Sequence, residues 1–258
     1  MTFKRGDIVT RKSYNHDTAF KIINIKNDIY YLKGLEVRLY ADATGEDLEI
    51  YTPIAATPEE TNEYDRGFPK SNNDYFYLPA KILHLDGDKD YLDRCLKFYQ
   101  QKGIFAIGKK LVEEHIYENI LPLLKEYKPD IVIITGHDAY YSKKGDINDL
   151  NNYRNTKNFI NAVKVARKYE KDHEKLVIIA GACQSNYEEL IKAGANFASS
   201  PKRINIHALD PAIIAATLAL TEKNKEIDLL ELLDKTKYGH DGMGGLKSNG
   251  LMYVGYPR

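Results

Sequence analysis

The sequence predicts an α/β protein with a mostly parallel sheet covered by helices on both faces, preceded by a small β-barrel. Two observations support this fold class. From residue 80 onward, short apolar runs alternate with segments of helical periodicity, which is typical of parallel strands joined by crossover helices. Before residue 52, five short β-rich segments follow one another, separated by turn residues, at the spacing of a small barrel.

The first 51 residues are interpreted as a barrel module of the SH3-like or Tudor-like type. Its five predicted strands cover residues 6–11, 20–25, 29–32, 37–40 and 48–51. Residues 52–79 are predicted to be a linker, because the stretch from residue 52 to residue 73 contains three prolines and has little hydrophobic periodicity. Residues 80–258 then form the α/β domain.

The α/β domain is predicted from its alternating elements. Strands are expected at residues 81–85, 104–107, 130–134 and 176–180, and helices at residues 91–101, 113–127, 156–170 and 187–193. The runs at 130–134 and 176–180 are continuously apolar, as expected of strands buried on both faces. Further strands and helices continue to residue 254. Residues 242–245 lack the Lys-Ser/Thr ending of a phosphate-binding loop and are interpreted as a flexible loop.

Composition and cysteine usage narrow the class of protein. Lys+Arg and Asp+Glu are equal at 37 each, which argues against a dedicated nucleic-acid or membrane-surface binder. No apolar export segment opens the chain, and no apolar run approaches the roughly 18 residues of a spanning helix, so we expect a cytoplasmic protein. The two cysteines, Cys95 and Cys183, indicate neither a disulfide framework nor a structural zinc site. Cys95 and His84 fall within apolar patterns and are expected in the core.

Chemically useful residues follow three of the predicted strands. The strand ends read Asp86-Gly87-Asp88, Gly136-His137-Asp138 and Ala182-Cys183. Because the carboxyl ends of parallel strands meet at one edge of a sheet, we expect His137 and Cys183 to come within reach of each other. Their separation in sequence, 183 − 137 = 46 residues, fits one loop and one crossover helix.

Cys183 and His137 are the predicted catalytic pair. Cys183 precedes a predicted helix, where backbone N–H groups favour a thiolate, and a nearby imidazole would deliver a proton to a leaving amine. The amide of Cys183, with that of Gly136 or Asp138, would form an oxyanion hole. The alternative is that Cys183 is a small core residue and His137 caps a turn. No metal or organic cofactor is expected, because thiol–imidazole chemistry needs none.

Several blocks of the chain resemble a known family. The order of an apolar block ending in His and an apolar block ending in Ala-Cys resembles the caspase, gingipain and legumain group of cysteine peptidases. More closely, nearly the whole chain is similar to the YabG family of sporulation-specific proteases. One departure from the caspase-like pattern is that Asp138, and not Gly, follows His137. The blocks that carry the resemblance are Gly6–Val9, Arg11–Tyr14, Leu83–Asp88, Ile134–Tyr140, Ala180–Ser185, Ala193–Pro201 and Asn205–Pro211.

The resemblance implies a protease made in the mother cell that associates with the spore coat. Its partners would be protein substrates, namely spore-coat and related precursors, cut after arginine. A buried guanidinium requires a carboxylate partner, and Asp86 and Asp88 are the best placed, with solvated turn acids as the alternative. We also expect Ser200 to contact the substrate. The pair Arg66-Gly67 in the linker is a candidate site of self-cleavage.

Two other functions stay open. If Cys183 occupied a nucleophile elbow of the glutaminase or α/β-hydrolase kind, its base would follow it in sequence, and His207 would be that base. Ser185 in place of Gly counts against this alternative. The second is a non-catalytic spore-coat scaffold, in which Cys183 would have ordinary thiol reactivity. Asp138 is expected to be a solvent-facing turn acid, with orientation of the imidazole or contact with substrate as alternatives.

Overall fold

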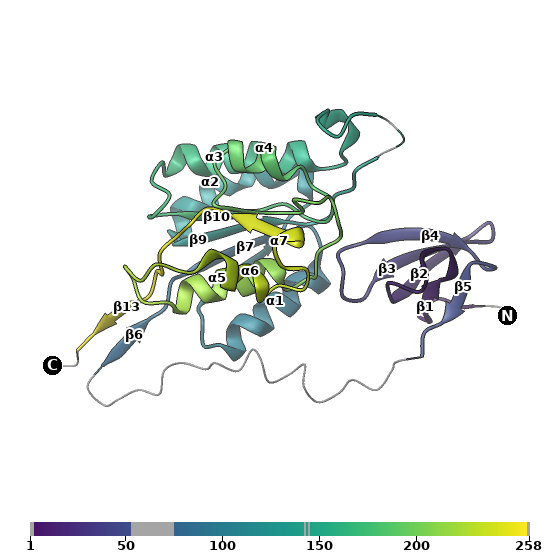
Figure 1. The fold of residues 1–258 in the computed structure, drawn as a ribbon, viewed down its shortest axis with the longest axis horizontal. Coiled ribbons are helices and arrows are strands. Elements are labelled where there is room, and N and C mark those ends of the chain that lie inside the picture. The colour runs from purple at the N-terminus through teal and green to yellow at the C-terminus, as the bar shows by residue number, and fades with distance from the viewer. Residues whose placement is uncertain (1–2, 53–74, 142, 144, 257–258) are drawn as a thin grey trace. The chain divides into compact units, whose positions relative to one another are not determined.

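The computed structural model describes residues 3–52, 75–141, 143 and 145–256 (Figure 1). The chain divides into two compact units, Met1–Pro69 and Lys70–Arg258, which are described in turn. Most of the predicted linker, with the candidate self-cleavage site Arg66-Gly67, lies outside the described residues. Among the residues that are described, no helix combines the length and the apolar character needed to cross a bilayer.

The first unit is built on a five-stranded antiparallel sheet in the order β4-β3-β2-β1-β5. Its strands are β1 (Ile8–Arg11), β2 (Phe20–Lys26), β3 (Ile29–Gly34), β4 (Tyr40–Thr44) and β5 (Leu48–Ile50), and a 3₁₀ turn, η1 (Lys12–Tyr14), follows β1. The strand predicted at 37–40 begins later, as β4 at Tyr40, because the Gly34 N–H donates to the Leu39 carbonyl at 2.7 Å and closes a wide turn before it. The likeness to SH3 and Tudor barrels stays a prediction.

The second unit contains a six-stranded sheet in the order β12-β11-β10-β9-β7-β8, in which only β12 is antiparallel to its neighbour. The strands are β7 (Ile82–Asp86), β8 (Ala106–Lys110), β9 (Ile131–Thr135), β10 (Val177–Ala180), β11 (Phe197–Ser199) and β12 (Met243–Gly245). The end of the predicted linker forms β6 (Phe76–Leu78), which pairs with β13 (Tyr253–Gly255). The prediction of a mostly parallel sheet is confirmed.

Strand β12 corrects the prediction of a flexible loop at residues 242–245. Its residues pair with β11, Phe197 opposite Gly245 and Ser199 opposite Met243. A Cβ atom at Gly245 would stand 2.3 Å from the Phe197 ring, so the glycine is needed for close approach of the two strands. The glycine-rich composition therefore reflects packing at the sheet edge and not a loop.

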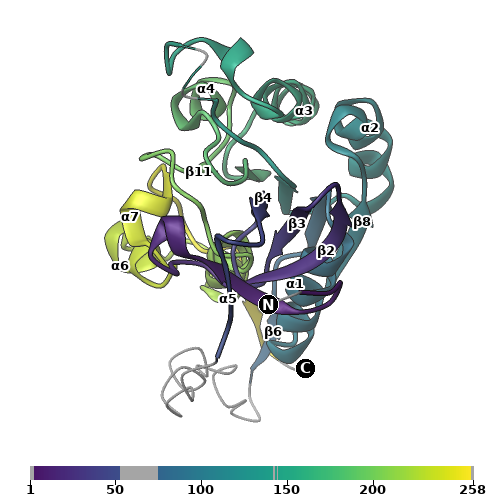
Figure 2. The same ribbon diagram turned by 90° about the vertical axis from the view of Figure 1, so that its right-hand side faces the viewer.

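Helices cover both faces of this sheet, as predicted (Figures 1 and 2). Alternate residues of β9 point to opposite sides: Ile131 and Ile133 pack with the first group of helices, and Val132 and Ile134 with the second. This double burial explains the continuous apolar runs. The first group is α1 (Lys89–Gln101), α5 (Asp210–Leu220) and α6 (Leu229–Asp234), and the second is α2 (Ile116–Tyr127), α3 (Thr156–Tyr169) and α4 (Tyr187–Lys192).

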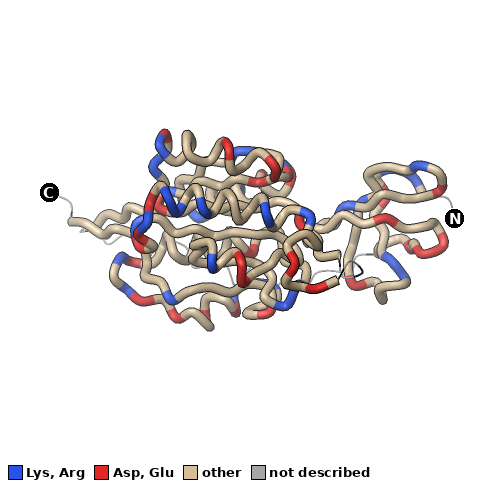
Figure 3. Tube along the Cα trace, turned by 90° about the horizontal axis from the view of Figure 1, so that it is seen from above, with Lys and Arg blue, Asp and Glu red and all other residues tan. Residues whose placement is uncertain are grey.

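Short elements complete the unit and adjust the predicted boundaries. The 3₁₀ turn η3 (Glu113–His115) opens the predicted helix at 113–127, η5 (Leu150–Asn152) precedes α3, and α7 (Gly239–Gly242) precedes β12. Acidic and basic residues are interspersed along the described parts of both units (Figure 3). Many of the ion pairs join exposed helix neighbours, such as Lys89 and Asp93 at 2.8 Å, and contribute little to stability. By contrast, the acids Asp86, Asp88 and Asp138 at the carboxyl edge of the sheet are buried.

Candidate active site

The loops that carry His137 and Cys183 start side by side. Strands β9 and β10 are adjacent and parallel, with Ile134 opposite Ala180 at their carboxyl ends. The Gly181 N–H donates to the Ile134 carbonyl at 3.0 Å, and the Thr135 hydroxyl donates to the Gly181 carbonyl at 2.8 Å. The two residues that the sequence singled out therefore lie on neighbouring loops at one edge of the sheet.

The His137 imidazole contacts a buried carboxylate. Its Nε2 lies 3.0 Å from Oδ2 of Asp88, and both side chains are buried. The other oxygen of Asp88 caps α1, accepting the N–H groups of Asp90 at 2.9 Å and Tyr91 at 3.4 Å. The Tyr91 ring packs 5.8 Å from the imidazole, centre to centre. Asp88, predicted to receive a substrate arginine, thus contacts His137 and caps the start of α1, and its role toward substrate stays a prediction.

The backbone of His137 is held from two sides. Its N–H donates to Oε1 of Glu113 at 2.7 Å, and its carbonyl accepts from the Asn155 side chain at 2.8 Å. Glu113, which is not among the residues predicted for the site, lies in η3, after the edge strand β8, two strands away from β9. The available signal was the glycine in each strand-end motif: a Cβ atom at Gly87 or Gly136 would meet Oε1 of Glu113 at 2.1 or 2.4 Å.

Asp138 is buried and accepts four hydrogen bonds, so the expectation of a solvent-facing turn acid is wrong. The donors are the N–H groups of Ala139 at 2.9 Å and Asn155 at 2.7 Å, the Ser185 hydroxyl at 2.7 Å and the Thr156 hydroxyl. Burial raises the pKa of the Asp138 carboxyl above its ordinary value, although the four donors act in the opposite direction. Asp138 thus connects its own loop to the start of α3 and to the Cys183 loop.

The Cys183 loop is tied to the His137 loop at two further points. The Ser185 hydroxyl donates a hydrogen bond to Asp138 and accepts one from the Ala182 N–H at 3.0 Å. The Gln184 side chain accepts the Tyr140 N–H at 3.1 Å. Gln184 itself has φ of 58°, in the left-handed region. The bonds from Ser185 to Asp138 and from Tyr140 to Gln184 fix the Cys183 loop and the His137 loop relative to each other.

The Cys183 thiol is fully buried. Its Sγ accepts the Ile206 N–H at 3.3 Å and lies 3.7 Å from the Ile206 carbonyl oxygen. The neighbouring Gln184 N–H donates to the Ile204 carbonyl at 3.0 Å. The segment 204–206 therefore runs directly alongside the candidate nucleophile.

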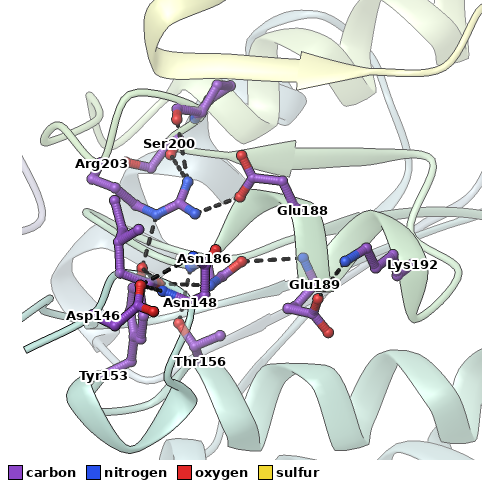
Figure 4. Close-up of polar contacts among 12 residues, drawn as sticks. Asp146, Asn148, Tyr153, Thr156, Asn186, Glu188, Glu189, Lys192, Ser200 and Arg203 are labelled. Carbon is purple, nitrogen blue, oxygen red and sulfur yellow. Dashed lines mark hydrogen bonds and ion pairs between the residues drawn. The ribbon is translucent and has the colours of Figure 1, made fainter.

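Arg203 directly precedes the segment 204–206 and anchors it. Figure 4 shows the polar contacts of its side chain. Its guanidinium donates to the Tyr153 hydroxyl at 2.9 Å, to the Ser200 carbonyl at 3.2 Å and to the Glu188 carboxylate. Burial disfavours the charge, but the bonds to Glu188 and Tyr153 outweigh it and raise the pKa of Arg203. The guanidinium is therefore charged and joins the 204–206 side of the site to α4 and to the loop before α3.

Ser200, for which a contact with substrate stays a prediction, lies in the turn that follows β11. It is fully buried, has φ of 68°, and donates its hydroxyl to the Ile204 carbonyl at 2.7 Å. Its N–H donates to the Gly242 carbonyl at 2.7 Å. These contacts give Ser200 a role in shaping the segment beside Cys183.

Asp86 is also engaged inside the protein. It is fully buried, its Oδ1 accepts the Asp88 N–H at 2.8 Å, and its Oδ2 lies 3.6 Å from Nε2 of His84. His84 is buried as expected, with Nδ1 3.0 Å from the Tyr99 hydroxyl. Cys95 is also buried, as expected. Binding of a substrate arginine by Asp86 stays a prediction.

His207, the alternative base, is half-buried at the start of the turn before α5. Its Nδ1 accepts the Leu209 N–H at 3.2 Å, and its own N–H donates to Asp210 at 2.8 Å. It directly follows Ile206, whose backbone contacts Cys183, while its own imidazole takes part in a local turn. Across the described ranges, no group of three or more His, Cys, Asp or Glu residues is arranged to hold a metal ion.

Fold and site together define a protein of two units, in which an α/β unit brings a histidine loop and a cysteine loop to one edge of a parallel sheet. The family model described as YabG peptidase U57 matches residues 4–67 and 55–257. The sporulation-specific protease YabG of Bacillus subtilis (strain 168) is 41% identical over 286 aligned residues, covering 100% of this chain and 99% of that protein. The chain belongs to the YabG family of sporulation peptidases, and the resemblance seen in the sequence blocks is confirmed.

Proposed function

We propose that this chain is a cysteine endopeptidase of sporulation, with Cys183 as nucleophile and His137 as base in a caspase-like α/β domain. The observation that carries the proposal is the link between the two loops: they leave adjacent parallel strands, and Ser185 donates to Asp138 across them at 2.7 Å. A thiol and an imidazole on loops held in this way are the components of nucleophilic acyl transfer.

Asp88 completes the proposed arrangement as the residue that orients the imidazole. A carboxylate accepts hydrogen bonds, so its contact with Nε2 places a proton on that nitrogen. The lone pair of the neutral ring is then on Nδ1, and this is the atom that takes the thiol proton. When His137 becomes an imidazolium, the Asp88 charge stabilises it at 3.0 Å.

The reaction proceeds in two halves. The Cys183 thiol gives its proton to His137, and the thiolate attacks the carbonyl carbon of the scissile bond. His137 passes the proton to the amine nitrogen as the C–N bond breaks, leaving an acyl group on Sγ. A water molecule then gives a proton to His137 while its oxygen attacks the thioester, and the departing thiolate of Cys183 recovers that proton.

The oxyanion of each tetrahedral intermediate requires N–H donors close to Cys183. The Cys183 N–H, with that of Gly136 or Asp138, is the proposed set. The His137 N–H is not part of it, because it donates to Glu113. Since the thiol is fully buried against Ile206, the segment 204–206 has to shift before a peptide reaches Sγ.

Spore-coat and related precursor proteins are the proposed substrates of this protease, which would be made in the mother cell and cut after arginine. The name of the Bacillus relative, a sporulation-specific protease, supports a role in sporulation. Asp86 and Asp88 remain the proposed acids for the arginine side chain, although the hydrogen bonds that each makes inside the protein count against this assignment.

Two observations favour alternative functions. The fully buried state of Cys183 favours a non-catalytic scaffold role, in which the thiol is a core residue. The contact of Ile206 with Sγ brings the neighbouring His207 into consideration as the base of a glutaminase-like or hydrolase-like site.

The experiment that separates these functions is cleavage of an arginyl fluorogenic peptide by the full chain and by Cys183→Ala, His137→Ala and His207→Ala, each checked for folding by thermal melting. Loss of activity in the first two variants, but not in His207→Ala, is the expected result. Loss in His207→Ala with activity retained in His137→Ala would move the base to His207. Activity retained in Cys183→Ala would exclude thiol catalysis, and coat precursors left unprocessed by every form would favour the scaffold.

A further inference from the structure

We propose that Glu113 is a positioning residue for His137, which sets the place of the imidazole by accepting the backbone N–H of that residue. This inference rests on the proposed function, because it concerns the same site. Glu113 belongs to η3, which follows β8 at the edge of the sheet, so it reaches the His137 loop from two strands away. It carries out no proton transfer itself.

The first support is the contact itself. Oε1 of Glu113 accepts the His137 N–H at 2.7 Å, and the Glu113 side chain is buried, with the residue 8% exposed. A charge-assisted hydrogen bond of this length is stronger and more directional than one between neutral groups. It fixes the peptide plane from which the His137 side chain departs, and so it fixes the direction in which the imidazole points.

The second support is how few hydrogen bonds the carboxylate makes. Among the described residues, the bond from His137 is the one hydrogen bond that the Glu113 side chain makes, whereas the Asp138 carboxylate accepts four. A buried carboxylate with a single donor depends strongly on that donor, because separating the two leaves a desolvated charge. The position of Glu113 and the position of the His137 backbone are therefore coupled.

The third support is the space made for the carboxylate. At Gly87 and at Gly136, the three atoms nearest to a built Cβ all belong to Glu113, with closest approaches of 2.1 and 2.4 Å. Neither glycine has its φ in the left-handed region, so alanine is acceptable to the backbone at both positions. Side-chain volume is excluded there because Glu113 occupies the space. Gly87 precedes Asp88 and Gly136 precedes His137, so one carboxylate packs against both ends of the Asp88–His137 pair.

The test compares two substitutions of Glu113 in the full chain. Glu113→Gln keeps an oxygen acceptor of the same reach, and Glu113→Ala removes it; Glu114→Ala, at the exposed neighbouring position, is the matched control. We expect Glu113→Ala to lower kcat on the arginyl peptide by about 10- to 100-fold with KM nearly unchanged, the effect of a misplaced catalytic group. Glu113→Gln should recover most of that loss, and Glu114→Ala should match wild type.

Gly87 and Gly136, which leave space for the Glu113 carboxylate, allow an independent test of the inference. Gly136→Ala should displace the carboxylate and lower kcat to the level of Glu113→Ala, and the double variant should be no slower than either single variant. Effects that multiply in the double variant would overturn the coupling, because independent contributions add in free energy. If Glu113→Ala fails to fold, the comparison of Glu113→Gln with Gly136→Ala still decides: loss in the second but not in the first supports the inference.

The outcomes also separate this inference from the proposed function. Wild-type kcat in Glu113→Ala, or equal loss in Glu113→Gln and Glu113→Ala, overturns the positioning role. If either result occurs while Cys183→Ala and His137→Ala are inactive, the peptidase proposal stands without Glu113. If Cys183→Ala remains active, the proposed function fails first, and Glu113 then has no imidazole to position for catalysis.

Discussion

Ser185 donates to Asp138 at 2.7 Å, and this bond joins the loop of the candidate nucleophile to the loop of the candidate base. Neither side chain takes part in the proposed chemistry. Asp138 follows His137 directly and Ser185 is two residues after Cys183. The bond therefore constrains the distance between the His137 loop and the Cys183 loop. Because the Ser185 hydroxyl also accepts the Ala182 N–H, the constraint extends to the end of β10.

Asp88 has two functions that substitution can separate. Asp88→Asn keeps an oxygen to cap α1, because asparagine is as good an N-cap as aspartate, but it removes the charge beside the imidazole. We expect an unchanged melting temperature and a kcat lowered at least about 10-fold, because the imidazolium loses its counter-charge. Asp88→Ala should lose the same activity and also about 1 kcal/mol of stability. Peptide kinetics with denaturant unfolding checks both, and full activity in Asp88→Asn would contradict the orienting role.

Arg203 is expected to control access to the thiol. Arg203→Ala removes the bonds to Tyr153, Glu188 and the Ser200 carbonyl, so the segment 204–206 should separate from Cys183 more often. The rate of Cys183 alkylation by iodoacetamide should then rise several-fold, because exposure of a thiol limits its reaction. Mass spectrometry of the labelled peptide measures the rate, with Lys202→Ala, an exposed neighbour, as control. An unchanged rate would mean that the thiol is covered by something other than this segment.

The raised pKa of Asp138 predicts a dependence of stability on pH. The native state binds a proton at Asp138 at higher pH than the unfolded chain does, where the pKa is about 3.9. The free energy of unfolding therefore falls as pH rises from about 4 through the raised pKa, and the stabilising contribution is complete only below that window. Asp138→Asn should lack this fall, so its stability relative to wild type should improve as pH rises across the window.

Urea unfolding at intervals between about pH 4 and pH 7 measures this effect. The control is Asp149→Asn, in which an exposed aspartate that caps η5 is replaced by another good capping residue. Its difference from wild type should stay nearly constant over the same range. A difference that is equally constant for Asp138→Asn would show that the buried carboxyl does not titrate in the window.

The sequence predicted the parallel sheet because its strands are buried on both faces. Residues 130–134 and 176–180 are apolar without alternation, and in the structure their side chains pack alternately against helices on the two sides. Such a pattern is a local property of the chain. The positions of His137 and Cys183 followed from the same reasoning, since parallel strands end at one edge.

The glycine-rich segment at 242–245 ends in strand β12 and not in a flexible loop, for a physical reason. Glycine permits a loop, but it also permits close approach, and the sequence alone does not distinguish the two. The approach of Phe197 to Gly245 decides the matter, and it depends on how β11 and β12 meet.

By itself, the sequence determined the α/β class, the mostly parallel sheet with helices on both faces, the pair of loops proposed to carry the chemistry, and the family. Tertiary structure alone decided what each polar residue of the site does. Asp86, Asp88 and Asp138 look alike as acids after strands, yet one is fully buried beside His84, one contacts His137 and one accepts four donors. Glu113 gave no signal of its own, because its bond to His137 joins segments 24 residues apart. The burial and the partners of a carboxylate are set by the segments packed around it, and these meet only once the chain has folded.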